Sequence, residues 1–262
     1  AIVKVATSNL KALANAFPER YRTRSMRWYD GAHKLAGWMA RKFDITLEQA
    51  AGAIAALSPQ GEWDANVTGA YRLIALTREF ESGRDNPKFT PTRWKTYLEQ
   101  QRKQAENRRH LHINRDGWDE ERAQQDFDKK MAEANANREN WIGKTWHQLE
   151  SPGQAGLLRA YELEQSPFRA HPRLKEFSRV YPSMAPEGHA SGQFNRGVTT
   201  GGAKGKIANF GWPESDPELT RAIEIIKSGL PTNIDYQLGE GTKVRNFYNN
   251  IVAPSDPNYV TV

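Results

Sequence analysis

The sequence predicts a mainly α-helical protein whose helical core is interrupted by a large polar insertion. Apolar residues recur at helical spacing in two places, near the start of the chain and near its end. The chain between them is polar, and little of it has the alternating pattern of a strand. We therefore expect an N-terminal core part (1–80), an insertion (81–203) and a C-terminal core part (204–262).

The N-terminal part opens its clearest helix at Thr46. Thr46 as N-cap and Gln49 three residues later form a capping box. The run from Ala50 to Leu57 is small and apolar on every side, so we expect this helix to be buried. Pro59 stops it, and a second helix is predicted to start near Trp63.

The insertion changes character along its length. After about Arg84 the chain is rich in Gln, Glu, Lys and Arg and poor in aliphatic residues. We expect one or two solvated helices, with a projecting hairpin as one arrangement, and residues 85–165 too polar to share the main core. Residues 168–206 are rich in Gly, Ser, Pro and basic residues, which favours a loop.

The C-terminal part is predicted to contain two helices joined through a glycine-rich turn. The first runs from about Pro217 to Gly229, with proline near its start and glycine at its end. The last carries an apolar stripe that includes Val244, Phe247 and Ile251.

Composition excludes several classes of site. The absence of cysteine rules out disulfides, cysteine-ligated zinc and iron–sulfur clusters. No apolar run approaches the roughly 20 residues needed to cross a bilayer, and the N-terminus has no signal-peptide core. We expect a soluble cytoplasmic protein, in the host cytoplasm if phage-encoded, with no membrane partner and no cofactor.

Two further motifs are weaker indications of a site. His110 and His112 with His147 are a poor metal set without cysteine, and we expect no metal. The glycine-rich "GGAKGK" fails as a Walker loop, since Ile207 follows the lysine, although a generic phosphate-binding loop remains an alternative.

The positive charge is concentrated in two segments. Residues 1–45 carry nine Lys and Arg against three acidic residues, a net of +6, and residues 168–206 carry seven against two, a net of +5. The whole chain carries +6, so the rest is neutral or acidic. This distribution favours a polyanionic partner, DNA above all, over a basic surface without a partner.

The turn "LGEGTK" between the last helices, Leu238 to Lys243, suits a phosphate. Gly239 and Gly241 tolerate positive φ and leave backbone N–H groups pointing outward beside a helix N-terminus. A plain C-cap turn before a terminal helix is the alternative.

This turn together with "ALSPQGEWDANV" resembles two sequence blocks of the helix-hairpin-helix DNA glycosylase superfamily. Members carry L-S-x-Q early in the chain, with an asparagine further on, and later a hairpin L-x-G-x-G-x-K. Here the first block is Leu57-Ser58-x-Gln60 with Asn66, and the hairpin is one residue shorter before its first glycine.

Within the superfamily the chain is most similar to phage enzymes of thymine hypermodification. The matching blocks span roughly residues 26–80 and 204–262 and include Trp28-Tyr29, Trp63 and Phe247-Tyr248. Those enzymes are thought to join an amino acid or polyamine to a phosphorylated hydroxymethyluracil in DNA.

The resemblance implies roles for particular residues. Gly239, Gly241, Thr242, Arg245 and Gln60 would contact nucleic acid, with Gln60 filling the gap left by a flipped base. Lys243 occupies the position of the catalytic Schiff-base lysine, or else contacts phosphate. The base pocket would be lined by Ser58, Trp63, Asn66 and Tyr29, although Trp63 equally suits a core position.

The function expected is therefore a phage-type DNA-binding enzyme that transfers an amine onto a modified thymine. A DNA glycosylase or lyase, and a non-catalytic DNA- or protein-binding module or truncated fragment, are the alternatives. The superfamily's catalytic Asp would follow Val262, and Asp256 lies too early in the chain to take its place. We therefore expect little glycosylase activity from these 262 residues, and a second polypeptide or a longer reading frame to complete the C-terminus.

Overall fold

A computed structural model describes residues 28–59, 63–165 and 216–256, together with Ala12, Ala16, Phe177 and Val180. These residues are mainly helical, which confirms the predicted fold class, and their only β-type pairing is an isolated bridge between Lys88 and Thr145. The helices are α3 (Trp28–Phe43), α4 (Leu47–Ala56), α5 (Trp63–Glu81), α6 (Pro91–Asn114), α7 (Glu120–Ala136), α8 (Arg138–Trp141), α9 (Ser151–Gln165), α12 (Asp216–Ser228), α13 (Pro231–Leu238) and α14 (Thr242–Val252), with a 3₁₀ turn η1 (Trp146–Gln148).

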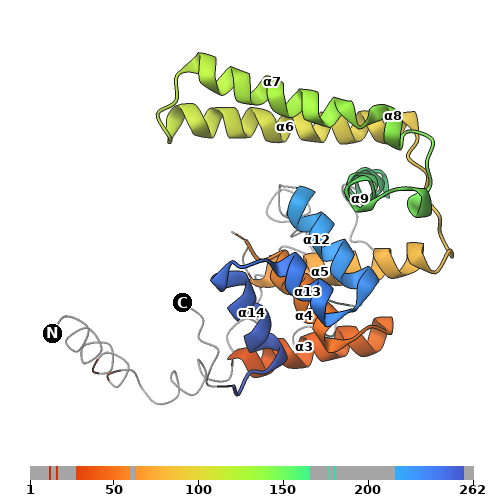
Figure 1. Ribbon diagram of the computed structural model, residues 1–262, viewed down its shortest axis with the longest axis vertical. Helices are drawn as coiled ribbons and strands as arrows, with labels where there is room; N and C mark the ends of the chain where they lie inside the picture. The colour runs from red at the N-terminus through yellow and green to blue at the C-terminus, as the bar shows by residue number, and fades with distance from the viewer. Residues whose placement is uncertain are drawn as a thin grey trace.

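Helix α4 is the centre of the body, and α3, α5, α12, α13 and α14 all pack around it (Figure 1). All of its residues from Gln49 to Ala56 are buried, as the small apolar sequence predicted. Gly52 allows the closest approach, because a Cβ there would lie 2.9 Å from Ile225 Cγ2 of α12. The segments near the two ends of the chain therefore share one core.

The predicted signals at the ends of α4 and α12 are present. Gln49 and Thr46 exchange both hydrogen bonds of the capping box, at 2.8 and 3.1 Å. Helix α4 ends at Ala56, before Pro59, and Gly229 follows α12 with φ +64°.

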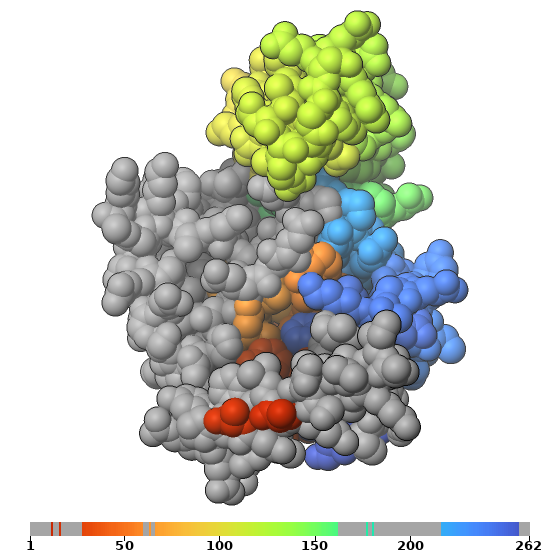
Figure 2. Space-filling model, turned by 90° about the vertical axis from the view of Figure 1, so that its left-hand side faces the viewer, coloured from red at the N-terminus to blue at the C-terminus, as the bar shows by residue number. Residues whose placement is uncertain are grey.

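Helices α6 and α7 pack against each other and form a hairpin that stands apart from the body, yellow-green in Figures 1 and 2. Residues 91–115 carry seven basic against two acidic residues, and residues 119–136 three basic against six acidic. Since only alanines are fully buried between the distal parts of the two helices, opposite charge contributes to their pairing.

The base of the hairpin is closed by backbone pairing. Phe89 N–H donates to the Lys144 carbonyl at 2.8 Å, and Gly143 N–H donates to the Phe89 carbonyl at 2.9 Å. Next to this pairing the rings of Phe89, Trp94, Tyr97 and Trp141 lie within 6.1 Å of one another.

The expectation that residues 85–165 are too polar to share the main core is wrong, because Phe89, the base of α6, Trp141, η1 and α9 all contribute to that core. Leu157 and Leu158 of α9 are fully buried in the same core as α4, and α9 packs against α6 and α12. Its polar residues find partners across the interface: Arg159 Nε lies 2.6 Å from Asp216 Oδ1, and Ser151 donates to Glu224. The polar composition of residues 85–165 therefore did not predict that α9 is buried.

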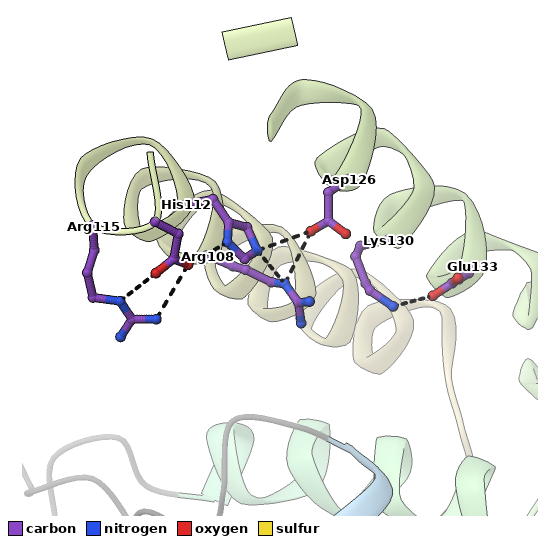
Figure 3. A network of polar contacts seen from close by, with 7 residues as sticks. Arg108, His112, Arg115, Asp126, Lys130 and Glu133 are labelled. Carbon is purple, nitrogen blue, oxygen red and sulfur yellow. Dashed lines mark hydrogen bonds and ion pairs between the residues drawn. The ribbon is translucent and has the colours of Figure 1, made fainter. Parts of the chain in front are cut away.

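His112 of the hairpin takes part in a polar network at its tip (Figure 3). His112 Nδ1 lies 2.9 Å from Asp116, and Arg108 Nε donates to His112 Nε2 at 3.2 Å while contacting Asp126. The His112 ring also stacks on Trp118 at 3.9 Å. In the described ranges, no three His, Asp or Glu side chains gather as a metal site would require.

None of the helices that the structure describes is both long and apolar enough to cross a membrane. Gln60, residues 168–176, 181–206 and 257–262, and most of the basic segment before Trp28 lie outside the described residues.

Candidate functional site

The turn between α13 and α14 depends on Gly239. This residue has φ +68° and ψ −168°, a backbone region that is essentially restricted to glycine. A Cβ at Gly239 would meet nothing within 4 Å, so the requirement comes from the backbone conformation and not from crowding. The predicted role of this glycine in shaping the turn thus has a specific conformational cause.

Gly241 plays a different part from the one expected of it. Its φ of −62° and ψ of 108° are open to any residue, so the expectation of positive φ at both glycines is wrong for Gly241. As N-cap of α14 it provides no side-chain hydrogen bond, and the first turn of α14 contains no acidic residue. A Cβ at Gly241 would meet nothing within 4 Å, so the space before the first amides of α14 is open.

Thr242 and Lys243, which begin α14, are both exposed. An uncapped helix N-terminus attracts an anion through its free N–H groups and its dipole, and an exposed lysine in the same turn adds charge. A Schiff-base lysine instead needs burial or a neighbouring cation to become nucleophilic. Lys243 has no such burial in this structure.

Arg245, one turn into α14, reaches back across the turn. Its Nε donates to the Gly239 carbonyl at 3.1 Å, and its Nη2 donates to the Asp235 carbonyl at 3.1 Å. The same Nη2 lies 3.7 Å from the Asp235 carboxylate. Arg245 was predicted to contact nucleic acid, and in this structure its Nε and Nη2 donate to the turn itself.

Two of the predicted base-pocket residues belong to an aromatic cluster that also includes α14. Trp63 packs edge-on against Trp28 at 4.7 Å, and Phe247 lies 6.1 Å from both of their rings and 6.2 Å from Tyr29. Trp63 is only 7% exposed, and its indole Nε1 has no hydrogen-bond partner among the described residues. The cluster therefore joins α3 and α5 to the helix that begins at the turn.

The other predicted pocket residues differ from one another in their setting. Ser58 Oγ donates to the Ala55 carbonyl at 2.7 Å and so helps to close the end of α4. Asn66 is buried, one turn after Trp63 on α5. The structure thus gives Ser58 a local structural bond and keeps Asn66 inside the body.

Tyr236, at the end of α13, was not singled out from the sequence. It is 80% exposed, although Ile234 and Leu238 on the same helix are buried. The helical spacing of those two apolar residues places Tyr236 on the opposite face, which is the signal that could have revealed it. Tyr236 precedes Gly239 by three residues in the sequence.

Comparison with known proteins adds one finding. A model of a family of unknown function, DUF7178, matches residues 4–95, which include α3, α4 and α5 and end within α6. The matched segment contains Trp28, Tyr29 and Trp63 of the aromatic cluster but not the α13–α14 turn. A search of the curated proteins and a search of the solved structures each find no significant match.

Proposed function

We propose that this protein binds DNA through the α13–α14 turn and acts on a modified thymine base, by transfer of an amine onto phosphorylated hydroxymethyluracil. The observation that carries the DNA-binding part is the open, uncapped N-terminus of α14 behind Gly241. Backbone amides in that arrangement bind phosphate without reading sequence, which suits an enzyme that recognises its target by the base it acts on. The transfer itself is what the resemblance implies.

The position of Lys243 favours a phosphate contact over glycosylase–lyase chemistry. Lys243 is exposed in the first turn of α14 and makes no recorded contact among the described residues. If it formed a Schiff base with an abasic sugar, borohydride would trap a covalent protein–DNA complex. We expect no trapping with duplexes that contain uracil or hydroxymethyluracil, and a trapped species lost in Lys243→Ala would establish the lyase instead.

The DNA-binding part is tested by fluorescence anisotropy with a labelled duplex over a range of salt concentrations. The logarithm of affinity should fall with the logarithm of salt concentration by about 0.9 per phosphate neutralised. Lys243→Ala should reduce that slope by roughly one contact. A flat salt dependence, or no binding at low salt, would contradict DNA binding.

A second variant tests the turn itself. Gly241→Val should weaken DNA binding, because the added side chain projects into the open space before the first amides of α14. The backbone angles of Gly241 suit valine, but valine is a poorer N-cap than glycine, so we also expect a small fall in the unfolding temperature. Ala132→Val, exposed on α7, is the matched control: valine has the lower helix propensity, so the unfolding temperature should fall slightly, while DNA affinity should not change. If Gly241→Val binds DNA as tightly as this control, the turn is not the contact.

A further inference from the structure

The geometry points to Arg245 as a positioning residue, which holds the α13–α14 turn in its phosphate-binding shape instead of contacting phosphate. The inference rests on the proposed DNA binding at this turn. It separates Arg245 from Lys243, although both are basic residues near the start of one helix.

The contacts of Arg245 span both sides of the turn. Its backbone N–H donates at 3.1 Å to the carbonyl of Gly241, and this is the first hydrogen bond of α14. Its side chain donates to the carbonyls of Gly239 and Asp235, which lie at and before the end of α13. One residue therefore ties the last turn of α13 to the first turn of α14.

The Asp235 carbonyl needs such a donor. In a continuing helix it would accept from the N–H of residue 239, but the Gly239 N–H donates to the Tyr236 carbonyl at 3.2 Å. The helix ends there because Gly239 leaves the helical region. A guanidinium at a helix C-terminus both satisfies the last carbonyls and interacts well with the helix dipole.

The Gly239 carbonyl sets the direction of the turn. No peptide bond in the described residues is cis, so the N–H of Glu240 points opposite to the carbonyl of Gly239 within one peptide plane. The bond from Arg245 restrains that carbonyl and hence keeps the Glu240 N–H pointing away from Arg245. Since glycine has the largest conformational freedom, the turn needs a restraint from outside its own residues.

The two basic residues should therefore affect DNA binding differently. Arg245 is 39% exposed and engages the turn through two donors, whereas Lys243 is exposed with no recorded contact. Loss of a phosphate-contacting charge lowers the salt dependence of binding, while loss of turn geometry lowers affinity at every salt concentration.

The experiment measures DNA affinity against salt concentration for folded Arg245→Ala, Lys243→Ala and Asp235→Asn at 25 °C. We expect Arg245→Ala to weaken binding roughly tenfold with an unchanged slope, as loss of the bonds to a charged donor would give. Lys243→Ala should lower the slope by about 0.9. Asp235→Asn keeps the carbonyl contact, and its DNA affinity should stay within about twofold of that of the parent.

Two outcomes would contradict the inference. A slope that falls as much in Arg245→Ala as in Lys243→Ala would make Arg245 a phosphate contact. An unchanged DNA affinity in Arg245→Ala would exclude a positioning role.

A measurement without DNA separates failure of this inference from failure of the proposed function. In the free protein, Arg245→Ala should shift the amide resonances of Gly239, Glu240 and Gly241 and speed their hydrogen exchange, and Lys243→Ala should leave Gly239 and Glu240 unchanged. Unaltered turn amides in Arg245→Ala would overturn the inference, whatever the DNA result. A parent protein that does not bind DNA would overturn the proposed function while these amides still report on the turn.

Discussion

The side-chain amide of Gln49 occupies the space that a side chain at Gly229 would enter. A Cβ at Gly229 would lie 2.9 Å from Gln49 Nε2, and that nitrogen donates to the Ile226 carbonyl at 2.6 Å. Gln49 therefore caps the start of α4 through its Oε1 and the end of α12 through its Nε2. One glutamine joins two helices that are about 180 residues apart in the sequence.

Gly229→Ala should destabilise the protein by about 2–4 kcal/mol, because a left-handed backbone and a steric overlap act together. Gly83→Ala is the matched control: its φ of +69° is similar, but a Cβ there would meet nothing within 4 Å. We expect the control to lose only the backbone part, about 1–2 kcal/mol, in urea unfolding. Equal losses would mean that Gln49 moves aside at no cost.

This relationship shows which part of the fold the sequence could predict. The capping box and the terminal glycine are local signals, since each involves residues a few positions apart, and both were predicted. The hydrogen bond that Gln49 Nε2 donates to the Ile226 carbonyl depends on how α4 and α12 pack. No pattern within either helix contains that information.

The same distinction explains α9 and the candidate site. The buried Arg159 and Ser151 of α9 are satisfied by Asp216 and Glu224 on α12, so their burial depends on a helix more than 50 residues away. At the site, the glycine spacing predicted a turn, but it did not predict the different φ of the two glycines or the contacts of Arg245 with Gly239 and Asp235. Local motifs can therefore predict where such a turn lies, whereas the contacts of its side chains depend on how the helices pack.

Gly52→Ala and Gly37→Ala should change stability in opposite directions. Both glycines lie inside helices, where alanine is favoured by about 1 kcal/mol. At Gly52 a Cβ would lie 2.9 Å from Ile225 and 3.3 Å from Ile234, so overpacking of about 1–3 kcal/mol should outweigh that gain. At Gly37 the nearest atom is Arg41 Nη1 at 3.5 Å, and the gain should remain. Thermal unfolding measures both, and a stabilised Gly52→Ala would show that α4 and α12 separate easily.

Tyr97 should make the protein less stable in alkaline solution. Burial, together with the nearby Asp216 carboxylate that its hydroxyl contacts at 3.1 Å, raises the pKa of Tyr97 far above its ordinary value. The unfolded chain then loses this proton near pH 10 while the folded chain keeps it. The stabilisation is therefore complete below pH about 10 and is lost as pH rises, by up to about 1.4 kcal/mol per pH unit.

The test compares the parent with Tyr97→Phe by urea unfolding between pH about 8 and pH about 11. This range includes pH about 10, where an ordinary tyrosine ionises. Tyr97→Phe should be less stable at pH about 8, because it lacks the bond to Asp216, and the gap should narrow as pH rises. Tyr236→Phe, exposed at the end of α13, should run parallel to the parent. A gap that is constant with pH would contradict the raised pKa of Tyr97.

Gly241→Asp should make the protein more stable and its DNA binding weaker. Aspartate is a preferred N-cap, and its charge interacts favourably with the N-terminus of α14, so we expect a gain of about 0.3–1 kcal/mol. The backbone angles of Gly241 suit aspartate, and its side chain would enter open space. The same carboxylate would accept the amide hydrogen bonds proposed for a phosphate and would repel it. Asn135→Asp, exposed on α7, changes the net charge equally and is the control for the effect of charge on DNA binding. Its own stability should fall slightly, because Asn135 donates to the Met131 carbonyl and aspartate cannot. Chemical unfolding and anisotropy at one salt concentration measure the two effects. If both variants bind DNA alike, the N-terminus of α14 is not where phosphate binds.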